Sequence, residues 1–180
     1  ARWMARTEAA VACVFPMERN VYLEAGARVE FVGHPLLDMI AVKQDDIEKL
    51  SQKLELIPGD PIIGLLPGSR SSEIDSLLPE MLGAAEKLQE DNKKLQFVIP
   101  LASGIDREKV SRMGSKYNLK VRIVKDCNHE VMKMADLLLV SSGTATLEAA
   151  ILKTPMIIMY KTGWSSYQLG KRLIQVDYIG

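Results

Sequence analysis

Short apolar runs alternate with helical patterns along most of this chain. After Pro61, continuous apolar stretches of strand length are each followed by a segment whose apolar residues recur every three or four positions. Such uninterrupted apolar strands are typical of a parallel sheet that is covered by helices on both faces. The pattern predicts this Rossmann-like α/β fold, with strands at 62–66, 95–101, 119–124 and 155–160 and helices at 71–90, 105–117, 128–135 and 164–176.

Two local features are predicted for the helix at 71–90. Ser72 and Asp75 have the spacing of a capping box at the start of a helix. Pro79 has no N–H group to donate and should kink or divide the helix.

The first 60 residues have a simpler pattern. Residues 9–15 and 29–32 have the composition of short strands, and the helical pattern between them begins at Pro16 and stops at Gly26. A Gly-His-Pro break and one polar helix near 44–54 follow, among turn residues. We interpret the segment from Gly33 to Pro61 as a linker region between two units.

The stretch 137–150 is the main candidate for a binding site. An apolar run stops there at two serines and a glycine, and a helical pattern begins at once. The first N–H groups of such a helix lack partners within it, and its dipole favours an anion, so the turn is a predicted phosphate site. Glu148 lies one turn after Thr144, on the same face of the helix. Its carboxylate would repel phosphate but could accept hydrogen bonds from the two hydroxyls of a ribose.

A second turn, Pro67-Gly68-Ser69-Arg70, follows the strand at 62–66. Ligands of parallel sheets bind at the carboxyl ends of the strands, and both turns fall there. Taken alone, Arg70 is best interpreted as a solvated side chain in the first turn of a helix. Because the turn at 141–144 is expected at the same edge of the sheet, a second interpretation gains support, in which the Arg70 guanidinium makes paired hydrogen bonds to a diphosphate. Neither turn matches the dinucleotide or Walker fingerprint, so hydride transfer and ATP hydrolysis have no support.

Composition and charge narrow the function classes. The 180 residues are 47% hydrophobic and 26% charged, as in ordinary soluble proteins. The 23 basic residues balance 23 acidic ones, so no overall field attracts nucleic acid. No apolar run approaches the ~18 residues of a membrane-spanning helix and no signal-peptide pattern is present, so we expect a cytosolic location. Cys13 and Cys127 form neither a metal-ligand spacing nor a disulfide framework and are interpreted as free thiols.

Four weaker candidates have structural explanations that are as good or better. His34 is interpreted as part of a turn, because no carboxylate or serine is placed for a relay. The loop at 125–128, next to His129, fits a nucleobase contact and a plain surface loop equally well. Cys127 lacks a base to activate it as a nucleophile. The aromatic and basic residues at 160–172 could touch a membrane or an acyl chain, but a helix docked on the core is slightly favoured.

The series of motifs resembles a known family, the lipid-A-disaccharide synthases. Each motif is weak alone, whereas their order and spacing together are specific, and the resemblance covers roughly the carboxyl-terminal half of such an enzyme. The motifs are Phe31-Val32-Gly33-His34-Pro35-Leu36-Leu37-Asp38, Leu65-Leu66-Pro67-Gly68-Ser69-Arg70 with Glu73-Ile74 and Leu77-Leu78-Pro79, Ser142-Gly143-Thr144-Ala145-Thr146-Leu147-Glu148, Pro155-Met156 to Tyr160, and Lys171-Arg172-Leu173.

The resemblance implies a GT-B type glycosyltransferase that performs an inverting hexosyl transfer without metal or cofactor. The donor would be UDP-2,3-diacylglucosamine and the acceptor lipid X, its 1-phosphate counterpart, giving the β-1,6-linked lipid A disaccharide and UDP. The enzyme would be peripheral at the cytoplasmic face of the inner membrane, which it would contact through its lipid substrates. The oligomeric state stays open.

The resemblance also implies roles for segments and residues. Residues 1–37 would be the end of the amino-terminal, acceptor domain with its linker, and residues 38–180 the donor-binding domain, without the family's later Leu-Pro-Asn motif. The general base would belong to the amino-terminal domain, so no catalytic residue is assigned here and the chain alone would be inactive. The UDP-binding residues would be Gly68, Ser69 and Arg70 at the diphosphate, Ser142, Gly143 and Thr144 at a phosphate, and Glu148 at the ribose.

Two alternatives remain open at this point. Another UDP-N-acetylglucosamine enzyme of the same fold, such as the murein-precursor transferase or the non-hydrolysing 2-epimerase, would share the glycine turn and the glutamate-bearing helix. A nucleotide-binding module without catalytic activity is the other.

Overall fold

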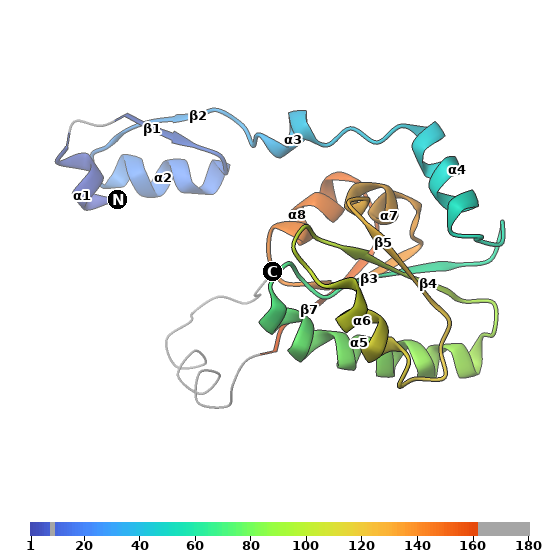
Figure 1. Ribbon diagram of the computed structural model, residues 1–180. Helices are drawn as coiled ribbons and strands as arrows, with labels where there is room; N and C mark the ends of the chain where they lie inside the picture. The colour runs from blue at the N-terminus through green and yellow to red at the C-terminus, as the bar shows by residue number, and fades with distance from the viewer. Residues whose placement is uncertain (8–9, 162–180) are drawn as a thin grey trace. The chain divides into compact units, whose positions relative to one another are not determined.

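A computed structural model describes residues 1–7 and 10–161 (Figure 1). The chain forms two compact units that divide between Ala41 and Val42, close to the predicted boundary after Leu37. Assignment of these units to an acceptor and a donor domain stays a prediction. The predicted helix at 164–176 lies outside the described residues, as does most of the segment at 160–172.

The first unit is a small βαβ arrangement. Strands β1 (Ala10–Cys13) and β2 (Arg28–Phe31) pair in parallel, and α2 (Pro16–Glu24) connects them. Gly26 ends α2 with a φ of 80°, which glycine adopts without strain. Two single turns, α1 (Arg2–Ala5) and α3 (Leu36–Met39), were not predicted, because four residues carry no helical periodicity.

The second unit contains the predicted parallel sheet. Its five strands lie in the order β5-β4-β3-β6-β7, and each neighbouring pair is parallel. The apolar runs located all five strands, which are β3 (Ile62–Leu66), β4 (Gln96–Leu101), β5 (Val121–Lys125), β6 (Leu137–Ser141) and β7 (Met156–Met159).

Helices cover both faces of this sheet, which confirms the predicted fold class (Figure 1). One face carries α5 (Ser71–Asp91) and α6 (Arg107–Gly114). The other carries α7 (Asn128–Met134) and α8 (Thr144–Ile151), and α4 (Gln44–Lys53) packs against α7.

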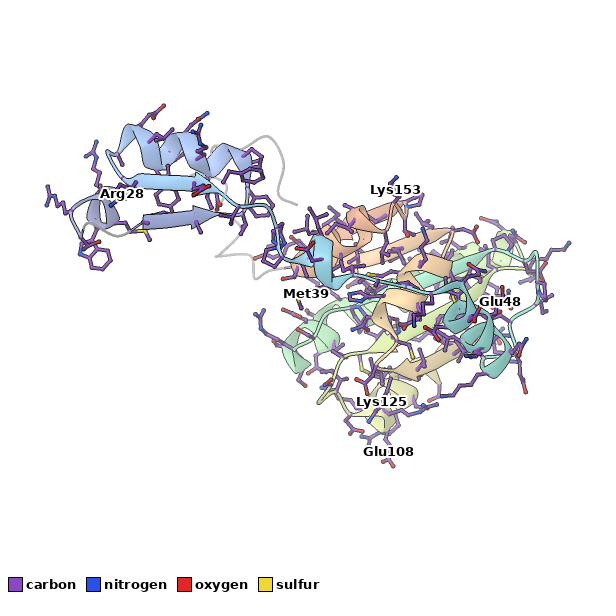
Figure 2. The ribbon with its side chains drawn as sticks, turned by 90° about the horizontal axis from the view of Figure 1, so that it is seen from above. Arg28, Met39, Glu48, Glu108, Lys125 and Lys153 are labelled. Carbon is purple, nitrogen blue, oxygen red and sulfur yellow. The ribbon has the colours of Figure 1, made fainter. Side chains whose placement is uncertain are left out.

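The core explains why the strands are apolar throughout. Successive side chains of a strand point to opposite faces, and in β4 both faces are covered. Phe97 and Ile99 pack with α5 and α6, whereas Val98 packs under α4 and α7 with Val124 and Val131. Figure 2 shows the side chains that fill the space between the sheet and its helices.

One prediction for α5 is wrong, and one alternative of a second prediction is wrong. The capping carboxylate is that of Glu73, not Asp75, because the N-cap position is Arg70 and not Ser72. Pro79 does not divide the helix, which continues to Asp91. The flanking residues Leu78, Met81 and Leu82 are fully buried, and this packing holds the helix together across the missing hydrogen bond.

The strand order reverses at β3. After β3 the chain adds β4 and β5 on one side, and it then crosses to the other side to add β6 and β7. The helices that follow β3 and β6 therefore lie on opposite faces, and the loops at the carboxyl ends of these two strands diverge. Ligands of open α/β sheets bind in the crevice at such a reversal.

Gln96 connects β4 to the loop that leads into β3. Its buried amide accepts a bond from the backbone N–H of Ile57 and donates to the carbonyls of Ile57 and Asp60. We expect Gln96→Leu to lower the free energy of unfolding by about 1–3 kcal/mol, because backbone groups lose their partners. Urea unfolding measures this change; Gln52→Leu, at an exposed position of α4, should change it by less than about 0.5 kcal/mol.

Candidate functional site

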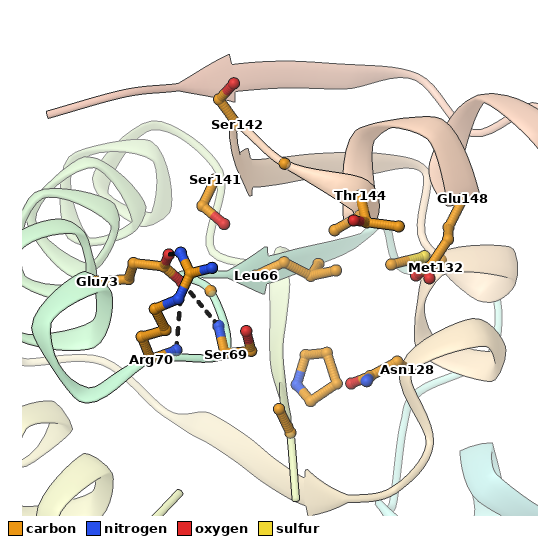
Figure 3. A pocket seen from close by; sticks show the side chains of 15 residues that line it. Leu66, Ser69, Arg70, Glu73, Asn128, Met132, Ser141, Ser142, Thr144 and Glu148 are labelled. Atoms are coloured by element: carbon orange, nitrogen blue, oxygen red, sulfur yellow. Dashed lines mark hydrogen bonds and ion pairs between the residues drawn. The ribbon is translucent and has the colours of Figure 1, made fainter. Parts of the chain in front are cut away.

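A pocket of about 300 Å³ lies at the carboxyl ends of β3 and β6, where the strand order reverses. All the residues that the sequence predicted for a UDP site line it: Gly68, Ser69, Arg70, Ser142, Gly143, Thr144 and Glu148. Ser141, from the predicted turn at 141–144, and Asn128, from the loop that fitted a nucleobase contact, also line the pocket. The sequence did not predict the other lining residues, which are Leu66, Glu73, Pro100, Ala102, Met132 and Ala145. In Figure 3, Arg70 and Glu73 lie toward one end of the pocket and Thr144 and Glu148 toward the other.

The start of α8 presents backbone donors to this pocket. Gly143 is the N-cap residue and the first turn of the helix contains no acidic side chain. Among residues 1–7 and 10–161, no acceptor is found for the N–H groups of Gly143, Thr144 and Ala145. These N–H groups and the helix dipole favour a negatively charged group.

Gly143 is not required by the protein's own packing. Its φ of 163° is an extended conformation that any residue adopts, and a Cβ atom built there meets nothing within 4 Å. The absence of a side chain leaves the N–H groups of α8 open to a bound molecule.

Glu148 lies in the pocket next to a residue that the sequence analysis had not paired with it. The carboxylate Oε2 of Glu148 is 3.5 Å from Nε2 of His129, and the Glu148 side chain is only 20% exposed. His129 belongs to the first turn of α7. The contact depends on the strand order, because right-handed crossovers in this sheet place α7 and α8 on the same face.

Arg70 and Glu73 form an ion pair at the other turn. The Arg70 Nη1 atom lies 2.6 Å from Glu73 Oε1, and the Arg70 side chain is 78% exposed. The second oxygen, Oε2, accepts hydrogen bonds from the backbone N–H groups of Ser69 at 2.9 Å and Arg70 at 3.2 Å. Burial by itself would raise the pKa of Glu73, but these backbone hydrogen bonds and the Arg70 guanidinium together hold that pKa below its ordinary value.

The remaining chemical candidates are structural. The His34 Nδ1 atom accepts the backbone N–H of Leu36 at 3.2 Å, and the ring packs against Phe15, as expected for a turn residue. Burial and the nearby Glu130 and Asp126 raise the pKa of Cys127, which disfavours the thiolate that a nucleophile needs. Both cysteines are free.

The described part of the chain contains neither a cluster of metal-binding side chains nor a membrane-spanning helix. Residues 1–7 and 10–161 contain no group of three or more His, Cys, Asp or Glu side chains that could hold a metal ion. None of the helices formed by these residues is long and apolar enough to cross a membrane.

Comparison with known proteins identifies the family. The whole chain, residues 1–180, matches the family model described as lipid-A-disaccharide synthetase. The chain belongs to this family. The family membership confirms the resemblance that the motifs predicted.

Curated members of the lipid-A-disaccharide synthetase family are close in sequence. The chain is 41% identical over 170 residues to lipid-A-disaccharide synthase of Geobacter sulfurreducens, and 42% identical over 170 residues to lipid-A-disaccharide synthase 1 of Legionella pneumophila. Each comparison covers 94% of this chain and 44% of the relative. The chain thus spans less than half the length of these relatives and corresponds to their carboxyl-terminal half.

A solved structure agrees on the fold. A glycosyltransferase from Rickettsia africae superposes with a TM-score of 0.50 over 89% of this chain and 46% of that protein, at 16% identity. The fold of this lipid-A-disaccharide synthetase family member is therefore the Rossmann-like fold of a GT-B glycosyltransferase domain.

Gly68 is the glycine that the turn in this family member requires. Its φ is 117°, and a Cβ atom there would collide with Oε2 of Glu73 and lie 2.8 Å from Cβ of Glu73. We expect Gly68→Ala to displace Glu73 and to lower the melting temperature by several degrees, at roughly 1–3 kcal/mol of strain. Differential scanning calorimetry measures this shift.

Gly143→Ala is the matched control for Gly68→Ala, because Gly143 has open space and extended backbone. An unchanged melting temperature for Gly68→Ala would contradict the assignment of Glu73 to the space beside Gly68.

Proposed function

We propose that this pocket binds the UDP part of UDP-2,3-diacylglucosamine, and that the chain is the donor-binding half of an inverting glycosyltransferase. The enzyme would transfer 2,3-diacylglucosamine to lipid X and release the β-1,6-linked lipid A disaccharide and UDP. The observation that supports this best is the convergence in one pocket of seven residues predicted separately from two turns and one helix. Family membership supports the same proposal.

The two ends of the pocket suit the two parts of a nucleoside diphosphate. The open N–H groups at the start of α8 would receive a phosphate, as helix N-termini do. Glu148, one turn further along α8, would accept hydrogen bonds from the ribose hydroxyls. Pro100, Ala102 and Met132 give the pocket an apolar wall against which a base could lie.

The chemistry follows from the charge of the leaving group. The 6-hydroxyl oxygen of the acceptor attacks the anomeric carbon of the donor, the bond from that carbon to the diphosphate oxygen breaks, and the electron pair leaves with UDP. The α8 N–H groups and Arg70 would stabilise this developing negative charge, so that no metal is needed. The hydroxyl proton passes to a general base, which we assign to the amino-terminal domain of the enzyme.

The substrates determine the proposed location and partners. Donor and acceptor both carry acyl chains, so the enzyme would work at the cytoplasmic face of the inner membrane as a peripheral protein. The equal numbers of basic and acidic residues, 23 of each, give no support for nucleic acid as a partner. In this proposal residues 1–37 are the end of the acceptor domain and its linker.

Calorimetry with UDP and with uridine tests the assignment of the two ends. We expect UDP to bind the 180-residue chain. Arg70→Ala should weaken UDP but leave uridine nearly unchanged, because the guanidinium addresses phosphate. Glu148→Ala should weaken both ligands, because both contain the ribose diol. Each loss should be about ten- to a hundredfold, the equivalent of ~1.5–3 kcal/mol for a hydrogen bond to a charged group.

Arg112→Ala and Glu108→Ala are the controls, because both residues are exposed on α6, outside the pocket (Figure 2 labels Glu108). Equal losses of UDP and uridine with Arg70→Ala would rule out its phosphate role. A chain that binds no UDP would refute the proposed site. Stronger binding of a diacylated donor than of UDP-N-acetylglucosamine would separate this enzyme from others of the same fold.

Gly143→Ala tests whether phosphate approaches the start of α8. Among the described residues, the added methyl group meets nothing within 4 Å, so the melting temperature should change little. UDP binding should fall by about tenfold or more, because the methyl group would occupy the space in front of the N–H groups. Gly114→Ala, at the end of α6 and also with open space, should leave UDP binding unchanged. Full UDP affinity in Gly143→Ala would exclude this position for the phosphate.

A further inference from the structure

The two turns that line the pocket differ in whether their backbone donors are already occupied. Among the described residues, the start of α8 has N–H groups without an acceptor. At the start of α5, the N–H groups of Ser69 and Arg70 both donate to Glu73 (Figure 3). The β3–α5 turn therefore contains an internal carboxylate in the position where a phosphate oxygen would otherwise bind.

The Glu73 carboxylate is a fixed part of this turn. Two backbone N–H groups hold Oε2, the Arg70 guanidinium holds Oε1, and the side chain is 28% exposed. The backbone is shaped around it, since a Cβ atom on Gly68 would overlap Glu73. Because this carboxylate belongs to the same chain, it competes for the donors at a high effective concentration, so a phosphate ligand is not expected to replace it.

Arg70 is the more exposed member of the pair. Its side chain is 78% exposed and only Nη1 contacts Glu73, at 2.6 Å. A guanidinium has five N–H donors in a planar fork, so most of them remain available while one bonds to Glu73. A carboxylate on one edge fixes the orientation of the plane and directs the other edge toward an anion.

We propose that Glu73 is a positioning residue that holds the Arg70 guanidinium toward the donor diphosphate, while its own bonds keep the β3–α5 turn from binding phosphate directly. This inference rests on the proposed function. Of the two turns, only the start of α8 would then bind phosphate through backbone N–H groups. The β3–α5 turn would contribute through the Arg70 side chain. The family resemblance had assigned the Gly68-Ser69 turn itself to the diphosphate.

The sign of a mutational effect tests the proposal. Removing a negative charge beside a phosphate site would by itself strengthen anion binding. Positioning predicts the opposite: Glu73→Gln should weaken UDP binding roughly three- to tenfold, in the range of coupling between neighbouring residues, and change uridine binding by less than about twofold. Glutamine still serves as the third residue of a capping box, so the turn should fold.

Calorimetry of four proteins carries out the test: the unchanged chain, Glu73→Gln, Arg70→Ala and the double variant. If Glu73 acts through Arg70, Glu73→Gln should have no further effect on UDP once Arg70 is alanine. Asp75→Asn is the matched control, because Asp75 lies on the same helix and pairs with Lys109 at 2.6 Å outside the pocket. Its UDP affinity should equal that of the unchanged chain.

Glu73→Asp provides a second variant that keeps the charge. The shorter side chain cannot reach the backbone N–H groups and the guanidinium together, so UDP binding should again weaken while uridine binding does not. Unchanged or tighter UDP binding in Glu73→Gln, or an equal loss in the Arg70→Ala background, would overturn the positioning role. Absence of UDP binding to the unchanged chain would instead overturn the proposed function, and this inference with it.

Discussion

The site depends on one constraint, the reversal of strand order in a parallel sheet. Right-handed crossovers place the helices after β4 and β3 on one face and those after β5 and β6 on the other. At the reversal, neighbouring strands are followed by loops that leave in opposite directions. The pocket lined by the turns at 67–70 and 141–144 follows from this topology rather than from any local sequence.

Sequence predicted well those features that depend on local pattern. The strands of the second unit were located because their apolar runs are nearly continuous, as is typical of a sheet covered on both faces. Glu148 was found because helical periodicity places it on the face of Thr144. The order of the strands in the sheet cannot be predicted from local sequence. The contact between His129 and Glu148 depends on that order and was therefore not predicted.

The capping box of α5 shows why some local features also escape a pattern. Ser72 and Asp75 have the expected residue types, whereas arginine is not a usual N-cap residue and its side chain cannot accept a hydrogen bond. The left-handed backbone of Gly68 brings the chain onto Glu73, and this carboxylate takes the backbone N–H groups of Ser69 and Arg70. The conformation of the turn therefore determines where the helix starts. A search for capping residues three positions apart cannot reveal that conformation.

A site proposed for a dianion contains two carboxylates, and their partners explain why this arrangement is stable. An unpaired carboxylate in a partly buried pocket would repel phosphate and be costly to desolvate. Glu73 is bonded by two backbone N–H groups and a guanidinium, and Glu148 lies beside His129. Glu73 is thus matched by donors of its own. The donors left over at the start of α8 and on the free edge of Arg70 define where additional negative charge can be accommodated. A pocket lined by two carboxylates and one guanidinium can in this way be selective for an anion, because selectivity depends on the placement of unmatched donors and not on net charge.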